Sequence, residues 1–94
     1  MQTFKIAHLK EQGQDLVIIP LEPDFANKSA NDQLKVRNAL QICATSAKLA
    51  GRVAVVWHDG GQFRFLAPPE WQPFFQSITW EFIAANLNKE LTCG

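Results

Sequence analysis

The chain has 94 residues, and its nine Lys and Arg balance nine Asp and Glu, so the formal net charge is zero. Hydrophobic residues make up 47% of the chain and charged residues 19%, which excludes intrinsic disorder and predicts one globular domain over residues 1–94. The zero net charge counts against non-specific binding to nucleic acid or anionic lipid.

The sequence carries no membrane span and no secretory signal. No apolar run approaches the roughly 20 residues of a span, and residues 1–6 lack a basic segment followed by an apolar one. We therefore expect a cytoplasmic protein without membrane contact. In that compartment we expect no structural disulfide, with Cys43 a buried thiol inside a helix and Cys93 an exposed thiol near the C-terminus.

The N-terminal part predicts two strands. Residues 3–9 alternate, with Phe4, Ile6 and His8 on one face, and residues 16–20 form a short apolar, β-branched run. The polar segment between them contains Gly13. It predicts a hairpin with a loop of several residues.

A connection of about a dozen residues, 20–32, precedes the clearest helix. Ser29, Asn31 and Asp32 are candidate N-caps, the helix is predicted over residues 33–50, and Gly51 suits the position after its end. Its polar residues form only a narrow stripe, and we expect the helix to be covered on more than one side. The apolar residues are Val36, Ala39, Leu40, Ile42, Cys43, Ala47 and Ala50.

Residues 52–57 and 62–66 predict a second hairpin, with positive φ angles supplied by Gly60 and Gly61. Pairing across this turn places one set of side chains on one face and a second set on the other. The first set is Ala54, Val56, Phe63 and Phe65, and the second is Val53, Val55, Trp57, Arg64 and Leu66. Both faces are largely apolar, so both should be covered.

The C-terminal part is aromatic and predicts two short helical segments, one limited by Pro73 and one over residues 79–87, with residues 92–94 fraying. The expected fold class is α+β: a mostly antiparallel four-stranded sheet packed on one long helix, with a short aromatic-rich helical segment at the C-terminus. The expected chain order is strand, strand, helix, strand, strand, helix, helix.

Candidates for chemistry are few. His58 and Asp59 resemble an acid–base pair, but neighbours on a strand point to opposite faces, and Asp59 suits the turn. His8 is expected to be a hydrogen-bonded, partly buried residue. Two histidines and two cysteines without metal-ligand spacing predict no metal site, and no motif predicts a cofactor or names catalytic residues.

The aromatic density predicts an interaction surface. Most of these rings belong in the core, but a domain this small has difficulty burying all of them, and exposed aromatic clusters mark interfaces and apolar pockets. We therefore expect a non-enzymatic binding module that uses this surface for a homodimer, another protein or a small apolar ligand. Its candidate residues are Trp57, Arg64, Trp71, Phe74, Phe75 and Trp80, with Trp71, Phe74 and Phe75 near Trp57.

Two alternatives remain open. One is a small enzyme with a site at a subunit boundary around His58, Asp59 and Arg64 and, as a further element, the loop 22–32. The other is binding of single-stranded nucleic acid, with the aromatic rings stacking on bases beside Arg52 and Arg64. The neutral charge disfavours the second alternative.

Overall fold

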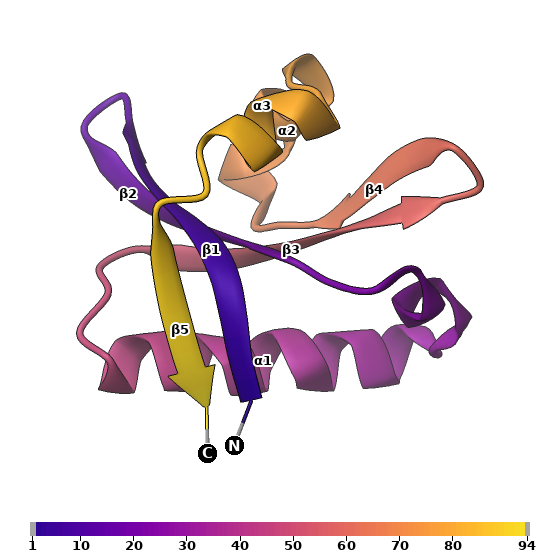
Figure 1. The fold of residues 1–94 in the computed structure, drawn as a ribbon, viewed down its shortest axis with the longest axis horizontal. Helices are drawn as coiled ribbons and strands as arrows, with labels where there is room; N and C mark the ends of the chain where they lie inside the picture. Colours follow the sequence, from indigo (N-terminus) through magenta and orange to yellow (C-terminus); the bar gives the residue numbers. More distant parts are fainter. Residues whose placement is uncertain (1, 94) are drawn as a thin grey trace.

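The computed structural model describes residues 2–93 as an α+β fold with a mixed sheet between two helical layers (Figure 1). The strands are β1 (Gln2–Glu11), β2 (Gln14–Pro20), β3 (Arg52–Asp59), β4 (Gln62–Leu66) and β5 (Lys89–Cys93). The helices are α1 (Ala30–Ser46), α2 (Gln72–Ser77) and α3 (Trp80–Ala85), with 3-10 turns η1 (Pro23–Asn27) and η2 (Pro69–Trp71).

The sheet has five strands in the order β4-β3-β2-β1-β5. β1 pairs antiparallel with β2 and β5, β3 pairs antiparallel with β4, and β2 pairs parallel with β3. The β2–β3 pair is parallel because α1 runs back along the sheet after β2, so that β3 starts at the same end of the sheet as β2. The α+β class is therefore confirmed, whereas the prediction of four strands is wrong.

Both hairpins turn through two residues with positive φ, the geometry that matches the twist of paired strands. Gln12 and Gly13 have φ angles of 51° and 79°, so the first loop is shorter than expected. The second turn uses Gly60 and Gly61, as predicted. Its register pairs Val56 with Phe65 and Trp57 with Arg64, which confirms the predicted sharing of faces.

β5 is the strand that the sequence did not predict, because residues 92 and 93 were expected to fray. Its side chains alternate, with Leu91 buried against the core and Glu90 and Thr92 exposed. Asn88, the residue before β5, is held by two hydrogen bonds between its side chain and the backbone of His8. Its Oδ1 accepts from the His8 amide at 2.9 Å, and its Nδ2 donates to the His8 carbonyl at 3.0 Å. A single inward Leu is too weak a pattern to predict a strand.

α1 begins at Ala30, three residues before the predicted start at Gln33, and it ends four residues before the predicted end at Ala50. The Ser29 hydroxyl accepts a hydrogen bond from the Asp32 amide and caps the first turn. The helix ends at Ser46, not at Ala50, and Lys48 adopts the left-handed conformation (φ 63°) expected of Gly51. The physical reason is that Gly51 is needed beside β2, where its α-carbon faces the backbone of Asp15.

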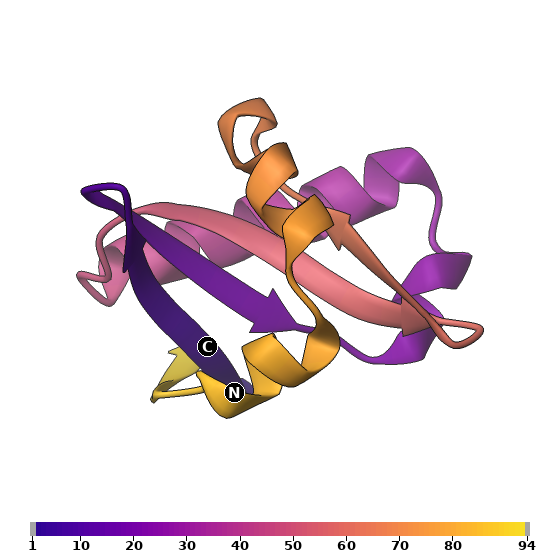
Figure 2. The same cartoon turned by 90° about the horizontal axis from the view of Figure 1, so that it is seen from above.

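The two faces of the sheet carry separate cores, and Figure 2 shows α2 and α3 crossing the face opposite to α1. The core under α1 contains Ile6, Val17, Ile19, Phe25, Leu40, Ala44, Val53, Val55, Trp57 and Leu91. The core under α2 and α3 contains Ala7, Leu16, Ile18, Ala54, Val56, Trp71, Phe75 and Ile83. The prediction that both faces of the second hairpin are covered is confirmed.

Polar side chains of α1 complete the hydrogen bonding of β3 where β4 does not reach. Gln41 accepts from the Val53 amide at 2.8 Å, and Arg37 donates to the Val53 carbonyl at 3.0 Å. Burial lowers the pKa of the Arg37 guanidinium, the nearby charge of Arg52 lowers it further, and Glu70 acts in the opposite direction. These contacts fix the position of α1 on the sheet.

Candidate functional site

The predicted aromatic surface is divided by the sheet. Trp57 is 6% exposed on the α1 side, where its ring meets Phe25 edge to face at 4.7 Å between centroids. Trp71 and Phe75 are buried on the opposite side. The predicted grouping of Trp57 with Trp71, Phe74 and Phe75 is therefore wrong, because Trp57 points to the α1 side of β3 whereas α2 covers the opposite side.

The aromatic residues from Phe63 to Phe82 all belong to the second core or pack against it. Phe65 stacks on Phe75 at 5.3 Å, and Phe74 meets Trp71 at 5.7 Å and Phe82 at 6.1 Å, both edge to face. Such pairs add specific geometry to the apolar area that the rings bury. Phe74 is half-buried within this network. The aromatic density thus has a structural explanation in the cover of one sheet face.

The structure separates the candidate acid–base pair. The His58 ring packs edge to face on Trp80 on the α3 side, with the ring centroids 4.0 Å apart. An Asp59 carboxylate oxygen instead lies 3.4 Å from Arg64 Nε. Arg64 is paired across the hairpin with Trp57, whose side chain belongs to the α1 side. Asp59 therefore engages Arg64 and not His58, and within residues 2–93 no hydrogen bond or ion pair joins a carboxylate to the His58 imidazole.

His8 is hydrogen-bonded and half-buried, as the sequence predicts. Its Nε2 lies 2.9 Å from the Ala50 carbonyl oxygen and its Nδ1 lies 3.2 Å from Lys89 Nζ. A carbonyl oxygen can only accept, so Nε2 carries the proton and Nδ1 accepts from the ammonium group. His8 links β1, β5 and the loop before β3, a structural role.

No cluster of three or more metal-ligating side chains occurs among residues 2–93. Glu22 and Asp24, at the start of η1, are both exposed. The loop 22–32, which was considered as a further element of an enzyme site, contributes Phe25 to the core and Ser29 to the cap of α1.

The two cysteines form a disulfide, which corrects the prediction of two separate thiols. Cys43 in the last turn of α1 is bonded to Cys93 in β5, with their Cα atoms 5.9 Å apart. Sequence separation gave no indication of this pairing, because β5 was not predicted, and β5 is the element that brings Cys93 beside the helix. Neither cysteine is therefore available as a free thiol in this form.

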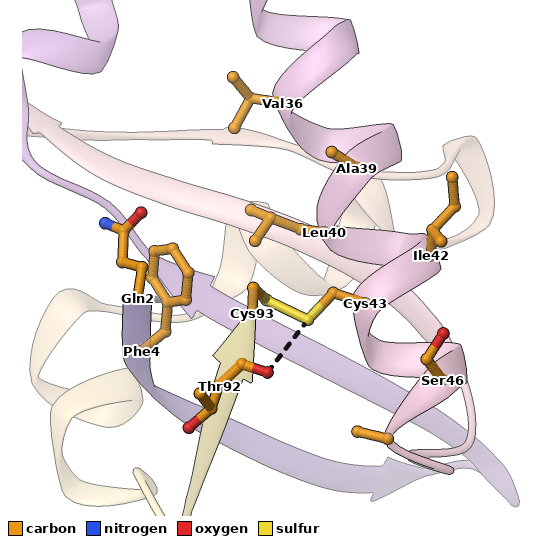
Figure 3. A pocket seen from close by; sticks show the side chains of 11 residues that line it. Gln2, Phe4, Val36, Ala39, Leu40, Ile42, Cys43, Ser46, Thr92 and Cys93 are labelled. Carbon is orange, nitrogen blue, oxygen red and sulfur yellow. Dashed lines mark hydrogen bonds between the residues drawn. A yellow bond between two sulfur atoms is a disulfide. The ribbon is translucent and has the colours of Figure 1, made fainter.

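The disulfide lies in an open groove of about 1090 Å³ between α1 and the paired strands β1 and β5 (Figure 3). The groove is lined by Gln2, Phe4, Val36, Ala39, Leu40, Ile42, Cys43, Ser46, Ala47, Thr92 and Cys93. None of these described lining residues is charged. Cys43 Sγ lies 3.5 Å from the Thr92 carbonyl oxygen, a packing contact, because a disulfide sulfur has no proton to donate.

Ile42 stands at the rim of this groove, on the outer side of α1 (Figure 3). It is 68% exposed and Leu34 is 47% exposed, and these two are the exposed large hydrophobic side chains among residues 2–93. Ile42 lines the groove, whereas Leu34 does not appear among its lining residues. An exposed apolar side chain beside an uncharged groove is a surface suited to bind another apolar surface.

Sequence reasoning did not identify this surface as a candidate site, although one signal was present. The apolar residues of α1 cover more of its circumference than one sheet can bury, and the sequence predicted cover on more than one side. The structure buries Leu40 and Ala44 against the sheet and leaves Ile42 in solvent. The surplus apolar residues of α1 therefore mark the candidate site.

Searches against family models, curated proteins and solved structures returned no match. No helix within residues 2–93 has the length and apolar character needed to cross a membrane.

Proposed function

We propose that this protein is a non-enzymatic interaction module that binds a second copy of itself through the groove between α1 and β1–β5. The observation that carries this proposal is the position of Ile42. Its aliphatic side chain is 68% exposed on the outer side of α1, and Ile42 is also one of the residues that line the uncharged groove.

A second copy suits this surface because a two-fold interface uses the same patch on both subunits. One copy offers a protruding side chain and a groove side by side, so each Ile42 can enter the groove of its partner. The chain has no net charge, and the groove's described lining residues carry none, so two copies bring no like charges together there. The second copy also supplies the additional cover that the apolar circumference of α1 predicts.

The edge strand β5 adjoins the same surface. The sheet ends at β5, and no strand among residues 2–93 pairs with its outer edge. An unpaired edge offers backbone donors and acceptors to another strand, and proline would weaken such pairing. The sequence Lys89-Glu90-Leu91-Thr92-Cys93 contains no proline. Two β5 strands pairing about a two-fold axis would place the α1 helices on one face of a continuous sheet, beside each other.

The proposal places the interface away from most of the aromatic residues predicted from sequence. Trp57, Trp71 and Phe75 are 6%, 6% and 1% exposed, so they offer little area to a partner. Phe74 and Trp80 are half-buried, and Arg64 is exposed. These last three residues stay candidates for a second, smaller contact with another protein or an apolar ligand.

The two alternative functions gain no support from the geometry. His58 and Asp59 engage different partners, as described above. Arg52 and Arg64, expected to lie beside stacked bases, each face a carboxylate, with Glu70 and Asp59 at 3.4 Å. Both residues are therefore partly neutralised as contacts for phosphate.

The test compares Ile42→Asp with Leu34→Asp by sedimentation velocity and native mass spectrometry. Both variants place a carboxylate on an exposed aliphatic position of α1, so they match in helix, charge and chemistry. We expect the parent and Leu34→Asp to dimerise at micromolar concentration. Ile42→Asp should raise the dissociation constant at least about tenfold, because the interface would have to desolvate the charge.

A parent protein that stays monomeric at about 100 μM would overturn the proposal, since that concentration detects even weak dimers. Equal effects of the two substitutions would place the interface elsewhere. A monomer that retains a non-protein adduct would make the groove a small-molecule site instead.

A further inference from the structure

We infer that the Cys43–Cys93 disulfide is a redox switch for this self-association, with the oxidised chain dimerising more tightly than the reduced one. The inference rests on the proposed function, since it assigns a regulator to the same surface. Its basis is that both cysteines line the groove while they bond its two walls to each other.

The bond joins the two elements that the interface would use. Cys43 follows Ile42 directly in α1, and Cys93 is the last residue of the edge strand β5. In Figure 3 the disulfide spans from the helix to the end of this strand. It therefore fixes the position of the exposed edge relative to the helix that carries Ile42. A surface held in its binding geometry loses less conformational freedom when a partner binds.

Without the disulfide, the first part of β5 has other attachments and its end has few. Leu91 is 1% exposed in the core, and Lys89 contacts His8 Nδ1 at 3.2 Å. Beyond Leu91, Thr92 and Cys93 keep their pairing with Thr3 and Gln2 of β1, and the Thr92 hydroxyl lies 3.1 Å from the Thr3 hydroxyl. Reduction should thus loosen residues 92 and 93 while the rest of the fold persists, because strand ends open at low cost.

Reduction of the disulfide requires a dithiol reductant that supplies two electrons. A thiolate of the reductant attacks one sulfur of the disulfide, forms a mixed disulfide and releases the other cysteine as a thiolate, which takes up a proton. The second thiol of the reductant, after losing its proton, attacks the mixed disulfide, frees the remaining cysteine and leaves the reductant as a disulfide. Two electrons pass to the protein. The exposed groove gives a reductant a route to the bond.

In the predicted cytoplasmic location the redox state of the Cys43–Cys93 pair can change, so the bond can regulate association. Reducing systems keep cytosolic thiols reduced, and disulfides that form there usually act in catalysis or redox sensing. In that compartment the dimer would assemble when a disulfide oxidises the two thiols by the reverse of this exchange, takes up the two electrons and is itself reduced to two thiols. In an oxidising compartment the same bond would stay closed and hold the interface permanently.

The experiment measures the dimer dissociation constant of the full chain by sedimentation velocity in three states. These are the oxidised protein, the protein reduced with dithiothreitol and alkylated with iodoacetamide, and the Cys43→Ser, Cys93→Ser double variant, which removes any contribution from the alkyl groups. Hydrogen exchange followed by mass spectrometry reports the protection of β5 in each state, and far-UV circular dichroism checks that each is folded.

We expect the dissociation constant to rise about tenfold in the reduced and double-variant proteins, with lost amide protection confined to the end of β5. Equal dissociation constants in the three folded states would overturn the switch and leave the proposed dimer intact. Tighter association of either state that lacks the disulfide would overturn the switch as well. If the oxidised protein does not dimerise, the proposed function fails and the switch fails with it.

Discussion

Gly51 occupies a position where the backbone conformation and the neighbouring strand leave no room for a side chain. Its φ angle is 108°, and an added Cβ would fall on the carbonyl group of Asp15 and the amide nitrogen of Leu16. We expect Gly51→Ala to lower the free energy of unfolding by about 2–4 kcal/mol, because it combines left-handed strain with a backbone clash. Urea denaturation followed by tryptophan fluorescence measures this loss.

Gly13→Ala is the matched control. Gly13 also has a positive φ angle, 79°, but no atom lies within 4 Å of its added Cβ. The control therefore isolates the cost of the left-handed conformation, about 1–2 kcal/mol. Equal losses for the two variants would show that the contact with Asp15 is not a constraint.

Single residues differ in how far the sequence revealed their roles. Ser29 was one of three candidate N-caps, with Asn31 and Asp32, and the structure shows that its hydroxyl caps α1. The partner of Cys43 was not predictable, because it depends on which strand lies beside α1. Ile42 was visible as an apolar residue of a helix, but its exposure follows from tertiary packing that periodicity alone does not determine.

At the scale of elements, the disulfide is the covalent link between α1 and β5. It connects residues 50 positions apart, and in the chain-entropy view closing a loop of that size stabilises the folded state by up to about 4 kcal/mol. We expect reduction and alkylation to lower the free energy of unfolding by about 2–4 kcal/mol. Urea titrations of the oxidised and alkylated proteins, run on the monomeric Ile42→Asp background, separate this effect from dimerisation.

An unchanged midpoint in that titration would mean that native contacts alone position β5. The expected loss is smaller than the total stability of many domains, about 5–15 kcal/mol, so a folded reduced protein is consistent with it. The redox switch requires that the reduced protein stays folded, because the switch changes the interface without unfolding the chain.

Elements with strong local patterns were predictable, and those defined by their partners were not. The β3–β4 hairpin was found with its register because two glycines fix the turn and β-branched residues flank it. β5 was missed because its single buried residue, Leu91, gives no period. The early end of α1 was missed because Gly51 looked like a helix cap, whereas its contact with β2 decides its role.

At the scale of the whole molecule, the sequence predicted the α+β class and the need for cover on both faces of the second hairpin. It did not predict that Trp71, Phe74 and Phe75 cover the face opposite to Trp57, because the placement of α2, the strand order and the parallel β2–β3 pair are set by long-range packing. The candidate site lies where α1 meets β1 and β5, and it required the strand that the sequence did not reveal. Its location was therefore beyond sequence reasoning.

The proposed dimer predicts that the melting temperature depends on protein concentration. A folded dimer that dissociates on unfolding gains stability by mass action, so the melting temperature of the oxidised parent should rise over a hundredfold increase in concentration, roughly 1 to 100 μM. Ile42→Asp should show a smaller rise, whereas Leu34→Asp should follow the parent, because Leu34 lies outside the groove. Differential scanning fluorimetry using intrinsic tryptophan emission measures all three. A melting temperature of the parent that is constant over this range would mean that the native chain gains no stability from a second copy, and the exposure of Ile42 would then need another explanation.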